Sequence, residues 1–211
     1  MLRGWKLGEA DRIVVFMTPD RGKVRAVAKG VRKTTSRFGG RLEAATHVAV
    51  QLFEGRGELH TVTQVEIRTR FPALRADLDR FASAMTLLEA VDIVGQEHHA
   101  DPGLHSMLVG ALGALQRRAS PLLAPAFLLR VLAHEGLVAL DDDGQLAGAG
   151  LPPRGLSPPA ADLVRRILGG GLGAALNEGS SAATHEVTEV ATRVFEASVE
   201  RRLRSAALLD R

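Results

Sequence analysis

Basic side chains that could hold a phosphate backbone crowd one stretch of this 211-residue chain, between residues 21 and 42. The stretch has eight lysines and arginines and no carboxylate, whereas the rest of the chain has more acidic than basic residues. A short positive segment on a slightly acidic body attracts polyanions and orients them on approach. The alternative is a solvated charged face without a partner. We interpret the stretch as a nucleic-acid contact in which the cations converge on one groove, and they are Arg21, Lys23, Arg25, Lys29, Arg32, Lys33, Arg37 and Arg41.

Aromatic rings near these cations could add base stacking. Phe38 is the aromatic residue inside the basic stretch, and we expect its ring to stack on a base, although a small barrel also uses its aromatic residues as core. Trp5 and Phe53 lie on other predicted strands, and we expect them to be buried. The chemistry expected of this stretch is therefore binding, through phosphates and one stacked ring.

Short segments rich in Val, Ile, Thr and Phe must position these groups. Five of them occupy residues 2–7, 12–18, 22–28, 47–53 and 59–67. A Pro-Asp-Arg-Gly turn separates the second and third, and a Gly-rich loop at residues 54–58 joins the last two as a hairpin. Five strands in so short a segment predict an N-terminal five-stranded β-barrel of the oligonucleotide-binding (OB) type at residues 1–70.

After Phe71-Pro72 the pattern changes to a helical period, which predicts an all-α C-terminal domain at residues 71–211 and an α+β fold overall. Asp101 and Ser157 each precede a proline as helix caps, and Gly95 and Gly169 stand where helices end. The last helix, from about residue 184, carries one apolar stripe. Residues 141–157 are acidic and then rich in Gly and Pro, and we expect an irregular loop there.

The remaining motifs argue against catalysis, metal and cofactor binding. The chain has no cysteine, so disulfides, thiolate zinc sites and cysteine nucleophiles are excluded. The run Asp141–Asp143 lacks the spacing of a calcium loop, and His98, His99 and His105 lack completing ligands. The glycines at 169–173 follow a predicted helix and lack the ending of a phosphate-binding loop. No apolar run reaches about 18 residues, so we expect a cytoplasmic, nucleoid-associated protein that does not enter the membrane.

The first 65 or so residues resemble the N-terminal domain of the RecO family of bacterial recombination mediators. Four motifs fall in that family's order and spacing: GEADR at residues 8–12, TPDRG at 18–22, AKG at 28–30 and SRFGG at 36–40. Weaker similarity continues in AFLLR at residues 126–130 with Gly136, and in LRS at 203–205 with Leu208 and Leu209.

This resemblance implies a DNA repair and recombination protein that is not an enzyme. It would bind single- and double-stranded DNA without sequence specificity, anneal complementary strands, and cooperate with RecR, and in some settings RecF, to load RecA onto strands coated by single-strand-binding protein. The C-terminal tail of that protein would dock on the helical domain, where Arg117, Arg118, Arg130, Arg165 and Arg166 are available. The resemblance places the DNA contacts at Lys29, Arg32, Lys33, Arg37 and Arg41, with Lys23 and Arg25 as weaker additions.

Two departures from the family pattern matter. Many members carry a four-cysteine zinc module after the segment that matches Gly136 to Asp143, and this chain has a shortened Asp/Gly/Pro segment instead, so we expect no zinc. Family sequences also commonly start several residues earlier, so we expect the first strand to be short and barrel closure to suffer.

Two other classes of function compete with this interpretation. Charge alone also permits an RNA-binding or ribosome-associated OB module. A metal-dependent nuclease ranks third, because no carboxylate cluster with metal-ligand spacing occurs in the sequence.

Overall fold

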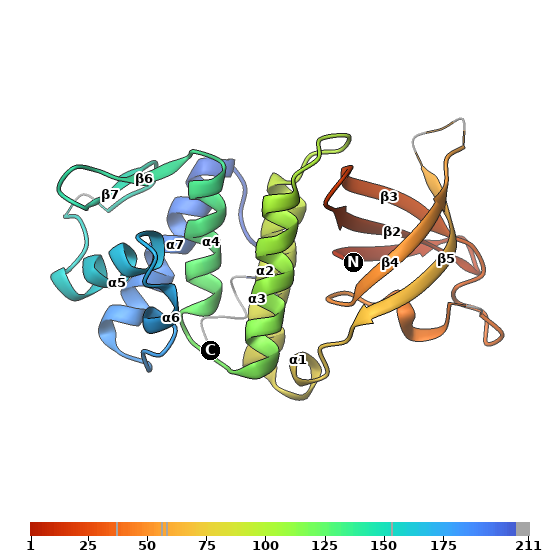
Figure 1. Cartoon of the computed structure of the whole chain (residues 1–211), viewed down its shortest axis with the longest axis horizontal. Coiled ribbons are helices and arrows are strands. Elements are labelled where there is room, and N and C mark those ends of the chain that lie inside the picture. Colours follow the sequence, from red (N-terminus) through yellow and green to blue (C-terminus); the bar gives the residue numbers. More distant parts are fainter. Residues whose placement is uncertain (37, 56, 58, 153, 206–211) are drawn as a thin grey trace.

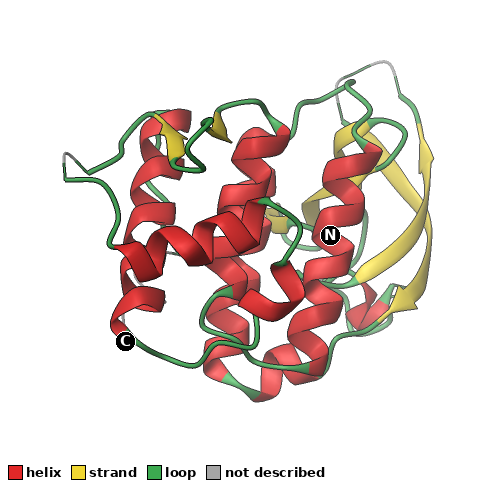
Figure 2. Ribbon diagram, turned by 60° about the vertical axis from the view of Figure 1, so that its left-hand side comes forward, coloured by secondary structure: helices red, strands yellow, loops and turns green. Residues whose placement is uncertain are grey.

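A strand-rich N-terminal part and a helical C-terminal part lie side by side in the computed structural model of the chain (Figure 1). The structure describes residues 1–36, 38–55, 57, 59–152 and 154–205. Figure 2 shows the strands of the N-terminal part gathered at one edge of the molecule, with helices filling most of the rest. None of the helices in these residues is long and apolar enough to cross a membrane.

The N-terminal part is a five-stranded sheet in the order β1-β2-β3-β5-β4. Its neighbours pair antiparallel except β3 and β5, which pair parallel. The five predicted strands are confirmed within two residues at each end, and the predicted class is confirmed as an OB-type domain followed by helices. The strands are β1 (Arg3–Leu7), β2 (Asp11–Thr18), β3 (Gly22–Ala28), β4 (His47–Phe53) and β5 (His60–Thr69).

Alternation along β2 and β3 places one set of side chains inside the curved sheet. Val14, Phe16 and Ala26 form an inner core with Val62 of β5 and with Leu42. In the described residues β1 and β4 form no ladder, so the sheet does not close into a full barrel. The gap is bridged at Met1, whose nitrogen donates to the carbonyl of Thr46 at 2.9 Å and whose carbonyl accepts from the N–H of Ala45 at 3.1 Å.

Seven helices follow among the described residues, and two of them are single turns. They are α1 (Ala73–Ala76), α2 (Leu78–Val94), α3 (Pro102–Arg117), α4 (Leu123–His134), α5 (Pro158–Leu168), α6 (Leu172–Ala175) and α7 (Ala182–Val199). The long helices α2 and α3 stand between the sheet and helices α4 to α7 (Figure 1). The pair of α2 and α3 is therefore covered by the sheet on one side and by other helices on the opposite side.

The helix ends confirm the capping signals in the sequence. Asp101 accepts the N–H of Leu104 at 2.8 Å at the start of α3, and Ser157 accepts the N–H of Ala160 at the start of α5. α2 ends at Gly95 and α5 at Gly169. Side-chain caps of this kind satisfy orphan backbone donors and stabilise a helix by about 1 kcal/mol each.

The segment expected to be an irregular loop begins as a β-hairpin. β6 (Val138–Leu140) pairs with β7 (Leu146–Gly148), and the side chain of Asp141 accepts the N–H of Asp143 at 3.0 Å and of Gln145 at 2.7 Å. The helical part is therefore not all-α, and the acidic run is the turn of this hairpin. Val138 and Leu146 are buried in the helical core, which explains why so short a hairpin forms.

A carboxylate on α2 fixes the last described segment of the chain. Glu89 accepts the N–H groups of Arg204 and Ser205 at 3.0 and 2.8 Å, and the hydroxyl of Ser205 at 2.6 Å. Burial alone would raise the pKa of Glu89, but these hydrogen bonds, with the charge of Arg201, lower it overall. These hydrogen bonds hold the last described segment of the chain against α2. Leu208 and Leu209 lie outside the described residues.

One core joins the sheet to the helices. Val15 and Met17, from the outer face of β2, and Leu2, just before β1, lie in the same buried cluster as Val91 of α2 and Leu104 of α3. The loop after α2 also adds backbone contacts, because the N–H of Lys23 donates to the carbonyl of Gln96 at 2.9 Å. The sheet and helices consequently form one packed body.

Gly22 packs closely against the backbone of the loop that follows α2. Its φ is +66°, and a Cβ there would lie 2.1 Å from the carbonyl oxygen of His99 and 2.5 Å from that of Gln96. Gly8, in the turn between β1 and β2, has a similar φ of +55° but no atom within 4 Å of the Cβ position. A side chain at Gly8 would therefore meet backbone strain alone, whereas a side chain at Gly22 would meet the same strain and a steric clash.

We predict that Gly22→Ala lowers the free energy of unfolding by about 2–4 kcal/mol, since it adds a clash with backbone to the strain of a positive φ. Gly8→Ala, the matched control, should lose only about 1 kcal/mol, because it has strain without a clash. Urea unfolding of the two variants measures the difference. Equal losses would show that the approach of the α2–α3 loop to β3 does not constrain the fold.

Candidate nucleic-acid interface

The structure divides the basic stretch into two groups instead of gathering it in one groove. Along β3 the residues alternate strictly: Val24, Ala26 and Ala28 are buried inside the sheet, while Lys23 and Arg25 point to the outer face. That outer face is the one that packs on α2 and the loop after it. The strand cations thus meet the helical part, whereas Lys29, Arg32 and Lys33 lie in the loop that follows β3.

Acidic partners hold the strand cations. The ammonium of Lys23 donates to the carbonyl of Asp92 at 2.7 Å and lies 3.8 Å from its carboxylate, which also pairs with Arg3. The guanidinium of Arg25 lies 2.8 Å from the carboxylate of Glu97. In the turn before β3, Arg21 pairs with Glu54. These three cations of the stretch are neutralised locally, so the expectation of a single groove lined by all eight is wrong.

The cations of the loop between β3 and β4 are exposed. Lys29, Arg32, Lys33 and Arg41 all belong to this group, whereas Arg37 lies outside the described residues. The guanidinium of Arg32 donates to the carbonyls of Gly8 and Glu9 at 3.1 and 2.8 Å, which holds the loop against the β1–β2 turn. The N–H of Gly30 adds a 2.7 Å hydrogen bond to the carboxylate of Asp11. The loop cations are therefore presented by an anchored loop.

The three aromatic residues exchange the roles expected of them. Phe38 is only 2% exposed and packs with Leu42 in the inner core, where the short turn Gly39–Arg41 carries both residues across the end of the sheet. Its ring has no surface to offer a base, so the stacking prediction for Phe38 is wrong. Trp5 and Phe53 are 39% and 64% exposed. Both are therefore surface residues, contrary to the expectation of burial.

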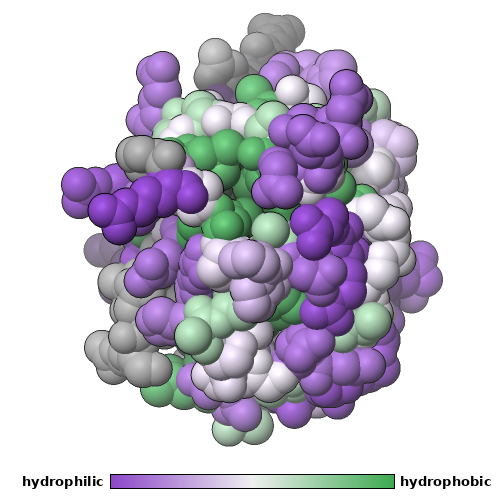
Figure 3. Space-filling model, turned by 90° about the vertical axis from the view of Figure 1, so that its left-hand side faces the viewer, coloured by the Kyte–Doolittle hydropathy of each residue, from purple (hydrophilic) through white to green (hydrophobic). Residues whose placement is uncertain are grey.

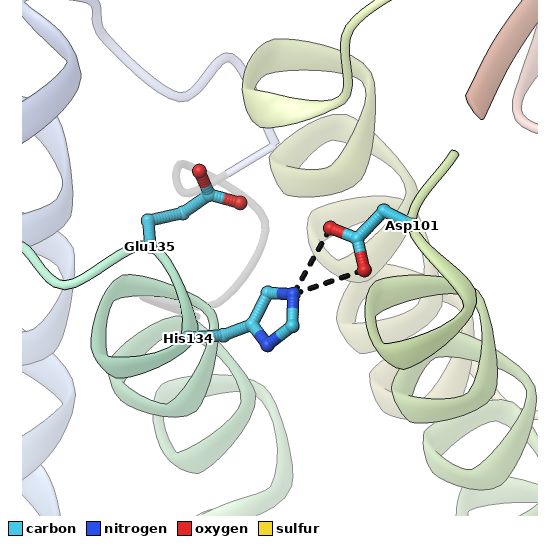
Figure 4. A group of neighbouring side chains, drawn as sticks. All are labelled: Asp101, His134 and Glu135. Carbon is cyan, nitrogen blue, oxygen red and sulfur yellow. Dashed lines mark hydrogen bonds and ion pairs between the residues drawn. The ribbon is translucent and has the colours of Figure 1, made fainter. Parts of the chain in front are cut away.

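A cluster of possible metal ligands occurs where α3 begins and α4 ends (Figure 4). Ligand atoms of Asp101, His134 and Glu135 lie within 4.8 Å of one another. The Asp101 carboxylate already caps α3 and lies 2.9–3.0 Å from Nε2 of His134. Burial raises its pKa, but the hydrogen bonds from Leu104 and His134 lower it overall. These contacts join the start of α3 to the end of α4, which gives the cluster a structural role.

The arginines proposed for protein docking are mostly engaged within the helical part. Arg118 donates to Asn177, Arg130 to the carbonyl of Ile167, and Arg165 and Arg166 pair with Asp162. Figure 3 shows the end of the helical part remote from the sheet, where apolar surface lies between hydrophilic side chains. The pairing of Arg165 and Arg166 with Asp162 makes these arginines of α5 less available to an acidic peptide.

A cleft of about 400 Å³ lies instead at the junction of the sheet and the helices. Apolar side chains of α1 and α2 and of the segment before them form its wall, and two exposed arginines, Arg70 and Arg75, stand among its lining residues. Glu43 is its acidic member, and it lies 3.8 Å from Arg12. The apolar wall consists chiefly of Phe71, Leu74, Phe81 and Met85.

Comparison with known proteins agrees with this architecture. Residues 1–71 match the family model "Recombination protein O N terminal", and residues 75–138 match "Recombination protein O C terminal". The chain is also similar to the DNA repair protein RecO of Nocardioides sp., with 49% identity over 140 residues, which are 64% of this chain and 57% of that protein. The chain thus spans little more than half the length of that relative. The two matches meet where the sheet gives way to the helices, and the chain belongs to the RecO family.

Proposed function

We propose that this chain is a DNA repair and recombination mediator that binds DNA through the loop between β3 and β4. The observation that carries the proposal is the division of the basic stretch. Lys29, Arg32, Lys33 and Arg41 are exposed on an anchored loop, while the strand cations are paired with carboxylates. The relative's name and the family membership support a role in DNA repair.

Contacts of this kind act on the phosphate backbone and not on base edges. Lys and Arg on a loop hold a strand by charge, so binding does not depend on sequence, and bases stay available for pairing. Annealing of complementary strands follows from that arrangement. We further propose that the chain acts with RecR, and in some settings RecF, to load RecA on strands coated by single-strand-binding protein.

The division of the stretch also changes the expected dependence on salt. If the four loop cations that the structure describes all reach phosphates of a single strand, the slope of log affinity against log salt concentration is about −2.8, and affinity falls roughly fiftyfold between about 50 and 200 mM salt. Eight cations would have given roughly a thousandfold loss or more over the same range. The slope of log affinity against log salt concentration therefore reports how many cations reach phosphates.

We predict that the double variant Lys29→Ala/Lys33→Ala reduces the single-strand salt slope by about 1.4, at an unchanged melting temperature. Arg25→Ala, the matched control, should leave the slope unchanged and lower the melting temperature, because it deprives Glu97 of its partner. Fluorescence anisotropy over a series of salt concentrations, with labelled oligonucleotides of two sequences, measures both slopes. A larger loss of slope in Arg25→Ala would place the DNA on the strand face instead. Tighter binding of RNA than of DNA at equal length would favour an RNA-binding module.

Annealing is tested on complementary strands coated with single-strand-binding protein. The chain should accelerate duplex formation, and Lys29→Ala/Lys33→Ala should lose most of that acceleration, because approach of two polyanions needs the neutralising cations. A fluorophore and quencher on the two strands report the rate. Acceleration that survives the double substitution would remove the loop from the mechanism.

The cleft at the junction is our proposed site for the acidic, apolar-ended tail of single-strand-binding protein. An apolar wall takes the end of such a peptide, and Arg70 and Arg75 face its carboxylates. We predict that Arg70→Ala/Arg75→Ala weakens binding of the tail peptide about tenfold or more, since charge-assisted hydrogen bonds contribute about 1.5–3 kcal/mol. Arg165→Ala, on α5, serves as control. Calorimetric titration of both variants decides, and an effect confined to Arg165→Ala would move the site to the remote end of the helical part.

A further inference from the structure

Five side chains in mutual register cross the outer face of the sheet, one on each strand. Trp5 of β1 pairs with Ile13 of β2, Ile13 with Val27 of β3, Val27 with Thr61 of β5, and Thr61 with Phe53 of β4. Register partners project to the same face of a sheet. These five residues, which we call the outer row, therefore form one line of side chains with an aromatic ring at each end.

The outer row lies just beyond the area that the helices cover. The neighbouring residues Val15, Lys23 and Arg25 on the same face meet the helical part, through the shared core or through Asp92 and Glu97. In the row, Trp5 is 39% and Phe53 64% exposed, and Ile13, Val27 and Thr61 are half-buried. A single exposed apolar residue needs no explanation, but two exposed aromatic rings at the ends of one apolar line are typical of a binding surface.

Charge on both sides of the row favours an anionic occupant. On one side, Lys29 follows Val27 by two residues, just after the end of β3, and Arg32 donates to the adjacent β1–β2 turn. On the other side, the guanidinium of Arg3 lies 4.8 Å from the centroid of the Trp5 ring, and the carboxylates of Asp92 and Glu97 are paired with cations. The exposed Glu9 is a nearby carboxylate, and Asp11 accepts the N–H of Gly30.

We propose that the outer row is a base-stacking platform for single-stranded DNA, with Trp5 and Phe53 as its stacking residues. The proposal rests on the proposed function, because it takes the loop cations as the phosphate contacts of the same strand. The row crosses four strand spacings, about 19 Å. That length suits the roughly four nucleotides that an OB-type barrel holds at minimum.

Stacking distinguishes this surface from the loop because it needs unpaired bases. A duplex hides its base faces, so only its phosphates can engage the chain, whereas a single strand can use both the loop and the outer row. Stacking on one aromatic ring changes affinity by about five- to 150-fold. Substitutions in the row should therefore act on single strands selectively.

The fluorescence of Trp5 gives a direct measurement, since the chain has one tryptophan and no tyrosine. Titration with oligothymidine should quench the Trp5 emission, and titration with duplex of equal length should quench it much less. Phe53→Ala should weaken oligothymidine binding about tenfold by anisotropy and duplex binding less than threefold. Trp5→Ala should change the affinities for oligothymidine and for duplex in the same way. Leu78→Ala, which removes an apolar side chain that is as exposed as Phe53 from the start of α2, is the control and should leave both affinities unchanged.

The possible results separate this inference from the proposed function. Oligothymidine binding seen by anisotropy without quenching, and without an effect of Phe53→Ala, overturns the platform and leaves the loop contacts standing. Failure of any DNA to bind overturns the proposed function itself. A fall in sedimentation coefficient on Phe53→Ala, in the absence of DNA, would identify the row as a contact between two copies of the chain and would also overturn the platform. Each variant is first checked for an unchanged melting curve.

Discussion

The packing of the outer face of β2 and β3 on α2 and α3 constrains everything else in this molecule. Val15 and Met17 are buried in the helical core, so the sheet owes part of its stability to the helices. Once that face is covered, Lys23 and Arg25 must find partners, because an unpaired charge in a half-buried site is costly. Asp92 and Glu97 supply them. The same contact therefore fixes the junction and removes two cations of the basic stretch from the proposed DNA-binding surface.

Local signals account for the part of the fold that was predictable from the sequence. Strand alternation, turn residues and caps act within a few residues, and they located all five strands and the helix ends at Gly95 and Gly169. Alternation shows which residues share a face, but it does not show what covers that face. The pairing of Lys23 with Asp92, 69 positions away, therefore had no signal in the sequence. The hairpin of β6 and β7 escaped prediction for a similar reason, since its strands form because Val138 and Leu146 reach the helical core.

The exchange of roles among the aromatic residues has a physical cause in the geometry of a small sheet. β1 and β4 are edge strands without a ladder between them, so residues on their outer face have few neighbours, and Trp5 and Phe53 stay exposed. The open end of the sheet needs filling, and the four-residue spacing of Phe38 and Leu42 lets the turn between them insert both side chains. In a stretch so rich in charge, Phe38 was a natural candidate for stacking. Only the structure shows that Phe38 and Leu42 flank a turn and that both side chains fill the inner core.

Loop cations and a stacking row together suit a protein that must hold strands and then release them. Phosphate contacts are common to single strands and duplex, so alone they would retain the annealed product as firmly as its precursors. Stacking is available only before pairing, because duplex formation buries the base faces in its own stack. In the proposed mechanism, each base that pairs gives up its contact with the outer row, so affinity falls as annealing proceeds. The division of the basic stretch would contribute to the same end, because the cations that are paired with Asp92, Glu97 and Glu54 would not add to the affinity for the duplex.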